Sequence, residues 1–502
     1  MAKLDKILYL LVTLFFVIPI SIWLIFWFKW YVSLPLVALF WYLAYQFTTR
    51  ERTLTNDQYR KIFNKKKWIV VSVIVILLNV LSGAGGLFYQ NWDYRVRDAV
   101  FSDLIQQDWP VTYDYHGDTE KQFGMHKGLL TYYFAWFLPG AIVGKAFGFT
   151  VGSLFLLLQQ IVGCLLFFYL IFRYLKAIKI RYVALFFILS GADIIGRVVL
   201  TRINGGSWGP LVGSDYIDVL PYGVGSLALP SFTTQLFWIL NTAVPAWLIT
   251  ALLLNEKDYK FIGLLLLFLI PFSPFPAVVL VLLIGAFIIT KQKDKIFKLK
   301  DLLSWQNIAC ILPLLPIAML FLSNSSGQAK GLSINRILSG NNDSVRGLLS
   351  TTIVYLCELA VFAVIARKGN RKQLFSYLIV LFVMSMFFLG DGLDLSMKGS
   401  GPALIAIYAL FCGYISEWGL RMRLKLQDAL VALMLTVGSI TPLHEVIRSI
   451  SYTHYDDTHH VSNYALNWGT FSEVRSDEML LFVKNFVSPY NSDSTLARYV
   501  LR

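Results

Sequence analysis

The chain has 502 residues, of which 57% are hydrophobic and only 15% are charged, and its mean hydropathy is +0.61. One water-soluble core cannot use so much apolar sequence, and the apolar runs are long enough to cross the roughly 30 Å hydrocarbon layer of a bilayer. The composition therefore excludes an ordinary soluble enzyme and predicts an all-α polytopic membrane protein.

The net charge of +14 would suit a nucleic-acid-binding protein, but the positions of the charges argue against that class. The basic residues gather between apolar segments, as cytoplasmic stop signals do, and there they attract anionic lipid headgroups. The clusters lie at 50–67, 173–181, 291–300, 367–372 and 421–425. We therefore expect membrane lipids as partners and no nucleic acid.

Taken in chain order, thirteen apolar segments are expected to form transmembrane helices, because backbone polar groups in lipid must be satisfied within the segment. They are 7–28, 31–47, 68–88, 151–173, 181–199, 232–254, 260–271, 276–290, 308–323, 347–367, 373–390, 402–418 and 427–441. The first resembles a signal peptide but lacks a small-residue cleavage site, so we expect it to be retained. An odd number of crossings places the N-terminus inside and the C-terminus outside, and every basic cluster is then cytoplasmic.

This arrangement predicts a transmembrane domain over 1–441 and an extracytoplasmic tail over 442–502. The largest outer loop is 89–150, directly after the third span. Ser273-Pro274-Phe275-Pro276 separates two short apolar segments, and its prolines predict a tight outer hairpin. All six histidines fall outside the predicted spans, which argues against a membrane-bound O-acyltransferase, a class that needs a histidine at the bilayer.

The apolar segment Leu129–Phe147 is the exception to the hydropathy pattern. A crossing here would move the cluster at 173–181 and every later basic cluster to the outer face, against the positive-inside bias. We therefore expect an amphipathic or partly embedded helix on the outer face, with Tyr132, Tyr133 and Trp136 at interfacial depth.

A string in the first outer loop carries a resemblance to a known family. Lys127-Gly128-Leu129-Leu130-Thr131-Tyr132-Tyr133 matches the pattern K-P-P-L-x-Y-W at the lysine, the second leucine and the first tyrosine, without its two prolines. An aspartate near the start of the loop precedes this string, and Phe147-Gly148 and a span ending in basic residues follow it. On these residues, the region 68–180 resembles the GT-C superfamily of integral-membrane glycosyltransferases, which includes the lipid A aminoarabinose transferases and the protein O-mannosyltransferases.

The resemblance implies a GT-C-like fold and an inverting transfer of a sugar from a polyprenyl-phosphate-linked donor to an envelope glycan or lipid acceptor. The reaction would take place on the outer face of the bacterial cytoplasmic membrane. Carried over residue by residue, the family string places Lys127 at the leaving phosphate and Tyr132 in the substrate site. Some relatives bind a divalent metal ion near this place, which makes His126 a candidate metal ligand, and the sequence indicates no other cofactor.

Such a transfer needs a carboxylate that accepts the proton of the acceptor hydroxyl and cations that hold the leaving phosphate. Asp93 follows the third span by a few residues, which would hold it at the membrane surface, where a lipid-linked anomeric carbon lies. Asp98 is the second candidate, on a short surface helix. The structural alternative for Asp93 is an ion pair with Arg97 one turn on, at the start of that helix.

Lys398 precedes Gly399-Ser400-Gly401-Pro402 and a span, so free amide groups at a helix N-terminus would bind an anion beside its ammonium group. The alternative is a snorkelling interfacial lysine. Arg197, near the outer end of its span, is a further candidate for the same pocket, unless Asp193 one turn earlier only neutralises it. Glu358 lies in an apolar run, where either a function or a hydrogen bond to a neighbouring helix would explain it.

Two other classes of function fit the composition. A transporter or flippase of lipid-linked saccharides should carry its polar residues at mid-membrane and commonly has paired repeats, whereas this chain keeps most acidic residues in outer loops and has no repeat. A non-catalytic scaffold for envelope assembly would tolerate alanine at Asp93.

The topology makes a prediction about accessibility. In a chain whose four native cysteines are replaced, a cysteine at position 117 or 451 should react with a membrane-impermeant reagent added outside intact cells. A cysteine in place of Asn64 or Lys293 should react only after permeabilisation. Labelling of position 451 only in permeabilised cells would overturn the thirteen-span topology.

Overall fold

The computed structural model describes residues 2–52, 54–91, 93–117, 120–121, 124–203, 219–222, 225–292, 295–323, 330–332, 344–389, 394–418, 425–455, 470–472, 483, 485–490 and 500–502. The predicted inner position of Lys293 and most of the tail lie outside the described residues.

Helices make up most of the described chain, as the composition predicts. The α-helices are α1 Ala2–Trp27, α2 Trp30–Thr48, α3 Asn56–Ile62, α4 Lys65–Leu81, α5 Asp93–Gln106, α7 Leu138–Phe147, α8 Phe149–Leu175, α9 Ile180–Ile188, α10 Asp193–Ile203, α11 Phe232–Trp238, α12 Leu240–Asn255, α13 Ile262–Leu269, α14 Pro274–Ile289, α15 Leu299–Leu302, α16 Trp305–Ala309, α17 Ile311–Ser323, α19 Ser344–Glu358, α20 Arg371–Ser385, α21 Asp394–Gly399, α22 Gly401–Trp418, α23 Leu426–Gly438 and α24 Ile440–Tyr455. Two 3-10 helices are η1 Ala84–Gly86 and η4 Ala360–Ile365. The strands are β1 Thr112–Asp114, β2 Lys127–Leu130, β3 Val219–Tyr222, β4 Gly225–Ala228, β5 Lys330–Leu332, β6 Phe387–Leu389 and β7 Val487–Pro489.

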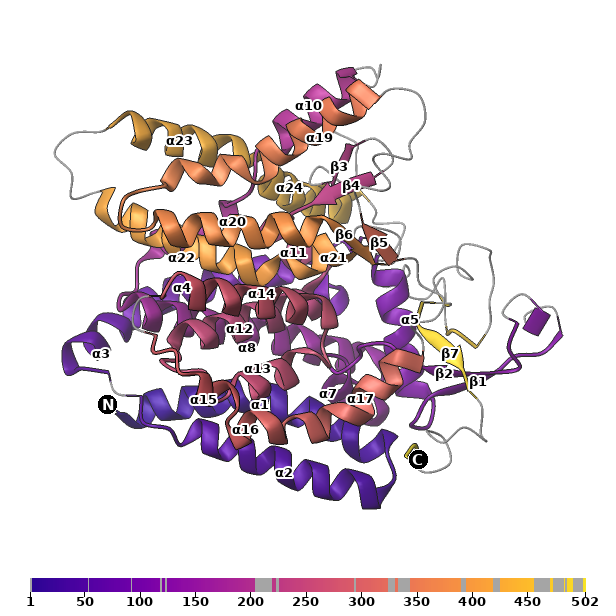
Figure 1. Cartoon of the computed structure of the whole chain (residues 1–502). Helices are drawn as coiled ribbons and strands as arrows, with labels where there is room; N and C mark the ends of the chain where they lie inside the picture. The colour runs from indigo at the N-terminus through magenta and orange to yellow at the C-terminus, as the bar shows by residue number, and fades with distance from the viewer. Residues whose placement is uncertain are drawn as a thin grey trace.

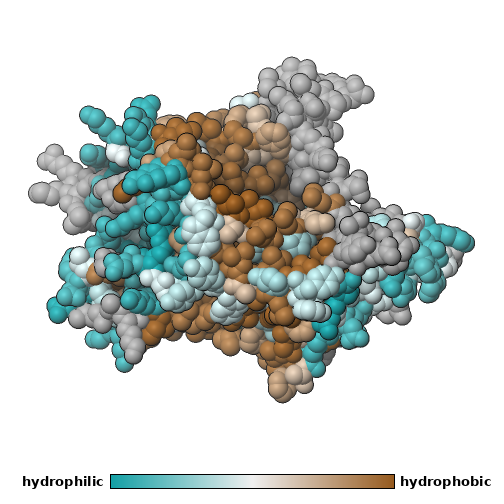
Figure 2. Space-filling model, turned by 60° about the horizontal axis from the view of Figure 1, so that its bottom comes forward, coloured by the Kyte–Doolittle hydropathy of each residue, from teal (hydrophilic) through white to brown (hydrophobic). Residues whose placement is uncertain are grey.

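Each of the thirteen segments expected to cross the membrane contains an α-helix. Among the described residues, five helices are long and apolar enough to cross a bilayer, and a bent pair would make a sixth. The five are Leu4–Trp27, Phe149–Leu175, Ile180–Arg202, Gly401–Trp418 and Leu426–Thr453, and the bent pair is Leu299–Ala309 with Ile311–Leu322. The long helices run in roughly the same direction (Figure 1), and the surface carries a hydrophobic band between two hydrophilic ends (Figure 2). The chain is therefore a mostly helical, membrane-associated protein.

The last apolar helix extends further than predicted. The sequence places its end at 441 and a tail from 442, but α24 continues to Tyr455, and the candidate span runs over Leu426–Thr453. His444 lies inside this candidate span, so the expectation that every histidine lies outside a span was wrong. Some polar groups of α24 have partners in other helices: Trp238 Nε1, for example, donates to Glu445 Oε2 at 2.9 Å. Hydropathy alone underestimates the length of a helix whose polar side chains have such partners.

The segment Leu129–Phe147 also differs from the prediction. Its start belongs to strand β2, and only its second half is helical, as α7. Trp136 is fully buried and Tyr133 is 8% exposed, so both pack inside the protein rather than lying against headgroups. Trp136, for example, packs edge-on against Phe15 of α1, with ring centroids 6.1 Å apart. The aromatic residues in the first half of this segment thus pack against the helices, whereas Ile142 and Phe147 of α7 are exposed.

A small antiparallel sheet joins the segment between α5 and α7 to the C-terminal segment. Its strand order is β1-β2-β7, with Asp114 opposite Lys127 and Gly128 opposite Pro489. Residues 500–502 then return to the connection between α1 and α2, where Arg502 N donates to Trp27 O at 2.9 Å. The two ends of the chain lie at opposite ends of the helical layer (Figure 1).

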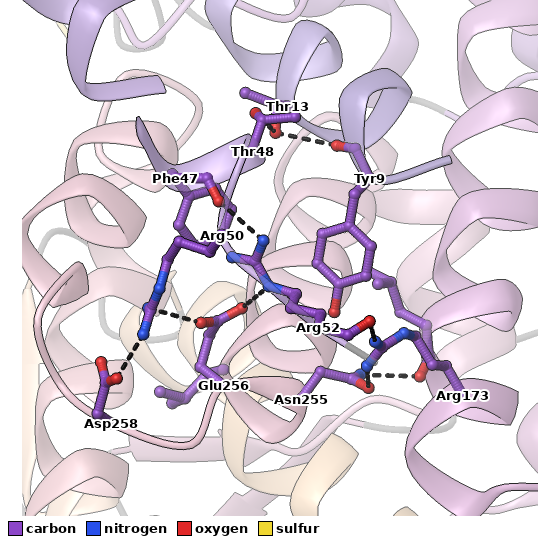
Figure 3. A network of polar contacts seen from close by, with 12 residues as sticks. Tyr9, Thr13, Phe47, Thr48, Arg50, Arg52, Arg173, Asn255, Glu256 and Asp258 are labelled. Carbon is purple, nitrogen blue, oxygen red and sulfur yellow. Dashed lines mark hydrogen bonds and ion pairs between the residues drawn. The ribbon is translucent and has the colours of Figure 1, made fainter. Parts of the chain in front are cut away.

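A network of arginines and carboxylates lies at the opposite end of the helices from this sheet (Figures 1 and 3). Arg50 Nη1 and Arg52 Nε donate to the two carboxylate oxygens of Glu256 at 2.9 and 2.7 Å, and Arg50 also pairs with Asp258. Arg173 Nη1 donates to the side-chain oxygen of Asn255, beside Glu256, at 3.2 Å. The network therefore ties the end of α12 to the α2–α3 connection and to α8.

Removal of Glu256 should destabilise this end of the protein. Its carboxylate is only 6% exposed and neutralises two guanidinium groups, of which that of Arg52 is 9% exposed. Because breaking a buried pair leaves a charge without compensation, Glu256→Ala should lower the free energy of unfolding by about 3 kcal/mol. Thermal unfolding of the purified protein in detergent measures this.

The matched control is Lys61→Ala. Lys61 pairs with Asp57 on α3, and both side chains are more than half exposed. Such a pair contributes little, so this variant should unfold at nearly the wild-type temperature. Equal effects of the two substitutions would contradict a stabilising role for Glu256.

Candidate active site

Helix α5 carries both candidate carboxylates, and its first turn is fixed by hydrogen bonds to two other helices. The backbone N–H of Asp93 donates to Asn91 Oδ1 at 3.2 Å, which caps the helix. Asn91 Nδ2 donates in turn to Phe237 O of α11 at 2.9 Å. Tyr94 OH donates to Ser82 O, just after α4, at 3.0 Å. The position of Asp93 is therefore set by the ends of α4 and α11.

The other end of α5 is held by α7. Lys145 Nζ donates to the carbonyl groups of Ile105 and Gln107 at 3.1 and 2.6 Å, which satisfies acceptors left free at a helix C-terminus. The two helices approach closely at Gly144, where a Cβ atom would lie 2.4 Å from Ile105 Cδ1. Lys145 is therefore a structural residue.

Asp103 ties α5 to the outer sheet and to the C-terminal segment. Its Oδ2 accepts hydrogen bonds from Tyr113 OH at 2.8 Å and from Phe471 N at 3.0 Å. Burial raises the pKa of Asp103 to about 7, although these two hydrogen bonds lower it. The carboxyl group thus joins three parts of the chain that are far apart in sequence.

Two ion pairs, one on α5 and one on α21, are the polar members of a cluster of charged and aromatic residues around Lys398, called the pocket below. Arg97 Nη2 lies 3.0 Å from Asp93 Oδ2, one turn along α5. Lys398 Nζ lies 2.8 Å from Asp394 Oδ1, one turn along α21. The charges of Lys398 and Asp394 act on the pKa of Asp93. Asp93 and Lys398, which are 305 positions apart, therefore lie within range of each other's charge, and a shared substrate site stays a prediction.

Aromatic rings cover the ammonium group of Lys398. Its Nζ lies 5.8 Å from the ring centroid of Tyr133 and 5.6 Å from that of Phe275, which stabilises the cation. Tyr132 packs against Tyr133 in a tilted arrangement with centroids 3.8 Å apart and against Phe486 at 4.2 Å. The first turn of α14 supplies Phe275, and the segment before β7 supplies Phe486. The residues of this cluster thus come from five separate parts of the chain.

The electrostatics of the pocket set the protonation of its two central groups. Burial raises the pKa of Asp93, while Arg97 and Lys398 lower it and Asp394 raises it. Burial alone would lower the pKa of Lys398, but Asp394 and both tyrosines raise it above its usual range. Lys398 is therefore a cation at neutral pH, and Asp93 is a weaker acid than an ordinary exposed aspartate. The Asp93 side chain is 22% exposed.

Asp98 faces a different part of the protein from Asp93. Five residues along an α-helix turn the side chain by about 140°, so the two carboxylates point away from each other. Asp98 is 8% exposed and interacts with Gln90, and burial raises its pKa to about 7 despite the nearby Arg97. That pKa suits proton transfer, but the position lies outside the group formed with Lys398.

The structure does not place Lys127 beside the two ion pairs. In the described part of the chain, its ammonium group lies 3.9 Å from Asp114 Oδ1 and 5.5 Å from the ring centroid of Tyr490. Arg197 lies on α10, which packs against α19. The described interactions of Asp93 and Lys398 include neither residue. The lysine carried over from the family string thus has a local partner on the outer sheet.

The predicted free amide groups beside Lys398 are partly used. Ser400 N donates to Ser396 O at 3.2 Å, so α21 runs almost directly into α22, and Pro402 has no N–H group. The amide of Ser400 is thus engaged within the helix, and binding of an anion at this helix start stays a prediction.

His126 lies on the exposed hairpin between β1 and β2. Its Nδ1 is 3.6 Å from Glu120 Oε2, and its ring centroid is 5.0 Å from that of His116. The ligand atoms of these three residues all lie within 4.8 Å of one another. Two imidazoles and a carboxylate form a donor set that suits a divalent transition metal.

Sequence reasoning missed four members of the pocket. Arg97 was read only as a partner of Asp93, and Tyr133 only as an interfacial ring. Phe275 was assigned only to a hairpin, and Asp394 was not considered. The four-residue spacing between Asp394 and Lys398 signals a helical ion pair and would have found the acid. Nothing in the local sequence signals that Phe275 meets Lys398, because that contact joins distant segments.

Comparison with known proteins adds no assignment to this geometry. No protein-family model, no curated protein and no solved structure matches the chain. The resemblance to GT-C glycosyltransferases therefore stays a prediction from the sequence. The residues around Asp93 and Lys398 are the basis on which a function can be proposed.

Proposed function

We propose that the chain is a membrane glycosyltransferase that moves a sugar from a polyprenyl-phosphate-linked donor to an envelope glycan or glycolipid. The observation that carries the proposal is the carboxylate of Asp93, which is partly exposed, has a raised pKa and faces two cations, Arg97 and Lys398. A general base and an anion-binding group are the two elements that such a transfer requires.

The proposed reaction assigns a role to each group. Asp93 takes the proton of the acceptor hydroxyl as its oxygen forms a bond to the anomeric carbon, on the face opposite the phosphate. The bond between that carbon and the phosphate oxygen breaks, and the electron pair leaves with the lipid phosphate. Lys398 and Arg97 stabilise the negative charge that develops there. Arg97 Nη1 is buried and has no hydrogen-bond partner among the described residues, and a phosphate oxygen would satisfy it.

The aromatic residues would bind the sugar and the lipid. Tyr132 and Tyr133 form an aromatic face beside Lys398, against which a sugar ring can pack while a hydroxyl group hydrogen-bonds. Burial raises the pKa of both phenols, so they are neutral hydrogen-bond donors.

The proposal includes the bacterial cytoplasmic membrane as location, with thirteen crossings, the N-terminus inside and the C-terminus outside. Two observations support an odd number of crossings: the chain ends lie at opposite ends of the helical layer, and the arginine-rich network lies opposite the outer sheet (Figure 1). By the positive-inside bias, the network with Arg50, Arg52 and Arg173 would face the cytoplasm. The pocket of Asp93 and Lys398 would then face outward.

Asp93→Asn should abolish transfer while the protein still inserts and accumulates. An amide keeps the shape of the side chain but cannot accept a proton at neutral pH, so the rate should fall about 100-fold or more. Transfer is measured with a radiolabelled polyprenyl-phosphate sugar and membranes from a strain that lacks the native protein. The acceptor is identified first, as the glycan that the deletion strain loses.

The matched variant is Asp98→Asn, which removes the other candidate base on α5. If Asp98→Asn is inactive and Asp93→Asn is active, the base is Asp98, whose pKa is about 7. If both variants keep wild-type activity, neither is the base and the proposal fails at its central residue.

The pH dependence of transfer should report the charges around Asp93. The base works when ionised, so activity should fall as the pH drops through the pKa of Asp93. Asp394→Asn removes a negative charge that raises this pKa and should move the acidic limb to lower pH. Lys398→Met removes a positive charge that lowers it and should move the limb to higher pH. Each shift should reach up to about one pH unit, the ordinary spread of carboxyl pKa values in proteins.

The control for this pH experiment is Asp114→Asn, which changes the net charge equally but lies on β1, with its side chain 59% exposed. Its acidic limb should stay at the wild-type pH. Shifts of the same sign for Asp394→Asn and Lys398→Met would rule out Asp93 as the titrating group.

A transporter of lipid-linked saccharides is the second candidate, and one observation favours it. Asp193 and Glu358 are both fully buried, and a Cβ at Gly191 would lie 2.9 Å from Asp193 Oδ1 and 3.2 Å from Glu358 Oε2. Asp193 belongs to the candidate span Ile180–Arg202, and carboxyl pairs in such places mark ion or proton pathways in transporters. The test is movement of a fluorescent lipid-linked saccharide across the membrane of vesicles that contain the protein and no acceptor. If this movement occurs, and if Asp193→Asn stops it while Asp93→Asn does not, the chain is a transporter.

A further inference from the structure

We propose that His116, Glu120 and His126 form a binding site for one divalent transition-metal ion, with Zn²⁺ as the best-suited ion, at the tip of the β1–β2 hairpin. The site is separate from the pocket of Asp93 and Lys398 and does not rest on the proposed function. The sequence analysis singled out His126 alone, and only through a resemblance; the other two ligands come from the geometry of the hairpin.

The hairpin places the two histidines side by side. The pairing of β1 with β2 ends at Asp114 opposite Lys127, and Tyr115 N then donates to His126 O at 2.8 Å. His116 follows Tyr115 directly, and His126 is itself the acceptor of this bond; the two ring centroids lie 5.0 Å apart. Two imidazoles on neighbouring strands are thus held within reach of one ion by backbone hydrogen bonds, not by chance contact of long side chains.

Glu120, which lies between the two strands in sequence, supplies a third ligand. Its Oε2 lies 3.6 Å from His126 Nδ1, and the ligand atoms of all three residues lie within 4.8 Å of one another. Zinc bonds of about 2.0–2.2 Å require ligand atoms roughly 3.3 Å apart in a tetrahedron. The side chains of His126 and Glu120 are 63% and 43% exposed, so small rotations can close this difference.

The donor set selects the class of ion. Neutral imidazole suits Zn²⁺, Cu²⁺ and Ni²⁺, whereas Mg²⁺ and Ca²⁺ prefer sites made of oxygen atoms alone. Three protein ligands leave the fourth position to water, which the exposure of the hairpin permits.

A bound ion would brace the hairpin rather than take part in sugar transfer. It would connect residues 116, 120 and 126 and so limit the motion of the segment between the strands. Strand β2 starts directly after His126 and leads within a few residues to Tyr132, which packs in the pocket. The metal would therefore steady one end of the strand whose other end positions Tyr132.

Zinc titration of the full-length protein in detergent, after treatment with a chelator, tests the site. Isothermal titration calorimetry should show one saturable zinc ion per chain. Loss of a residue that merely orients a metal ligand costs about 10- to 100-fold in affinity, so His116→Ala, Glu120→Ala and His126→Ala should each cost at least as much. Mg²⁺ at the same concentration should not compete.

Two control variants test whether other residues of the chain bind the zinc ion instead. Asp114→Ala removes an exposed acid of the same hairpin and should leave the affinity unchanged. Replacement of His454, His459 and His460 by alanine removes the histidines of the C-terminal segment and should also leave it unchanged. Zinc binding that survives the double variant His116→Ala/His126→Ala, or that disappears with the C-terminal histidines, would overturn the proposal.

Limited proteolysis gives a second readout that does not depend on affinity. Lys121 is exposed on the segment between the ligands, so trypsin should cut there. Zinc should slow this cleavage at least about tenfold in the wild type, if the ion closes the loop. The same rate of cleavage with and without zinc in the wild type, or equal protection of His126→Ala, would show that the ion does not bridge these residues.

Discussion

The carboxyl group of Asp103 is the interaction on which the outer part of the structure depends. Through Tyr113 OH and Phe471 N, it joins α5 to the sheet and to the C-terminal segment. Tyr132 and Phe486 lie close to the two parts of the chain that Asp103 joins to α5, whereas Asp93 is held by the ends of α4 and α11. Each partner is a donor, so the ionised carboxylate suits the hydrogen bonds, whereas burial favours the neutral acid. At this junction the hydrogen bonds favour the ionised form of Asp103, whereas removal of the carboxylate from water opposes that form.

The pocket beside this junction has two acids and two bases whose formal charges cancel. Such pairing explains how the charges persist in a partly buried place, since unpaired ions there would be costly. In the proposed reaction, the donor phosphate would compete with the Asp394 carboxylate for the ammonium group of Lys398. Asp394 is 40% exposed, so its side chain can turn toward water when this exchange occurs. The binding free energy of such a ligand would then be the difference between its ion pair with Lys398 and the Asp394–Lys398 pair that it replaces.

Much of the helical architecture could be predicted from the sequence, because long apolar runs and basic clusters report directly on lipid and headgroups. Asp93 and Lys398 could also be selected, since each is a charge next to an apolar segment, although their common pocket joins parts of the chain 305 positions apart. The length of α24 and the burial of Trp136 could not be predicted. Both depend on partners in other helices, such as Trp238 for Glu445, and hydropathy treats a side chain as though its surroundings were lipid or water.

The order in which the chain is made has a consequence for the β1-β2-β7 sheet. Val487 of β7 pairs with Leu130 of β2, and more than 350 positions separate these two residues. At a synthesis rate of about 5–20 residues per second, β2 waits roughly 20–70 s for its second neighbour. During that time one edge of the hairpin is unpaired and Tyr132 lacks the ring of Phe486, so the helices are inserted before the pocket is complete. The pocket is thus among the last parts of the protein to form.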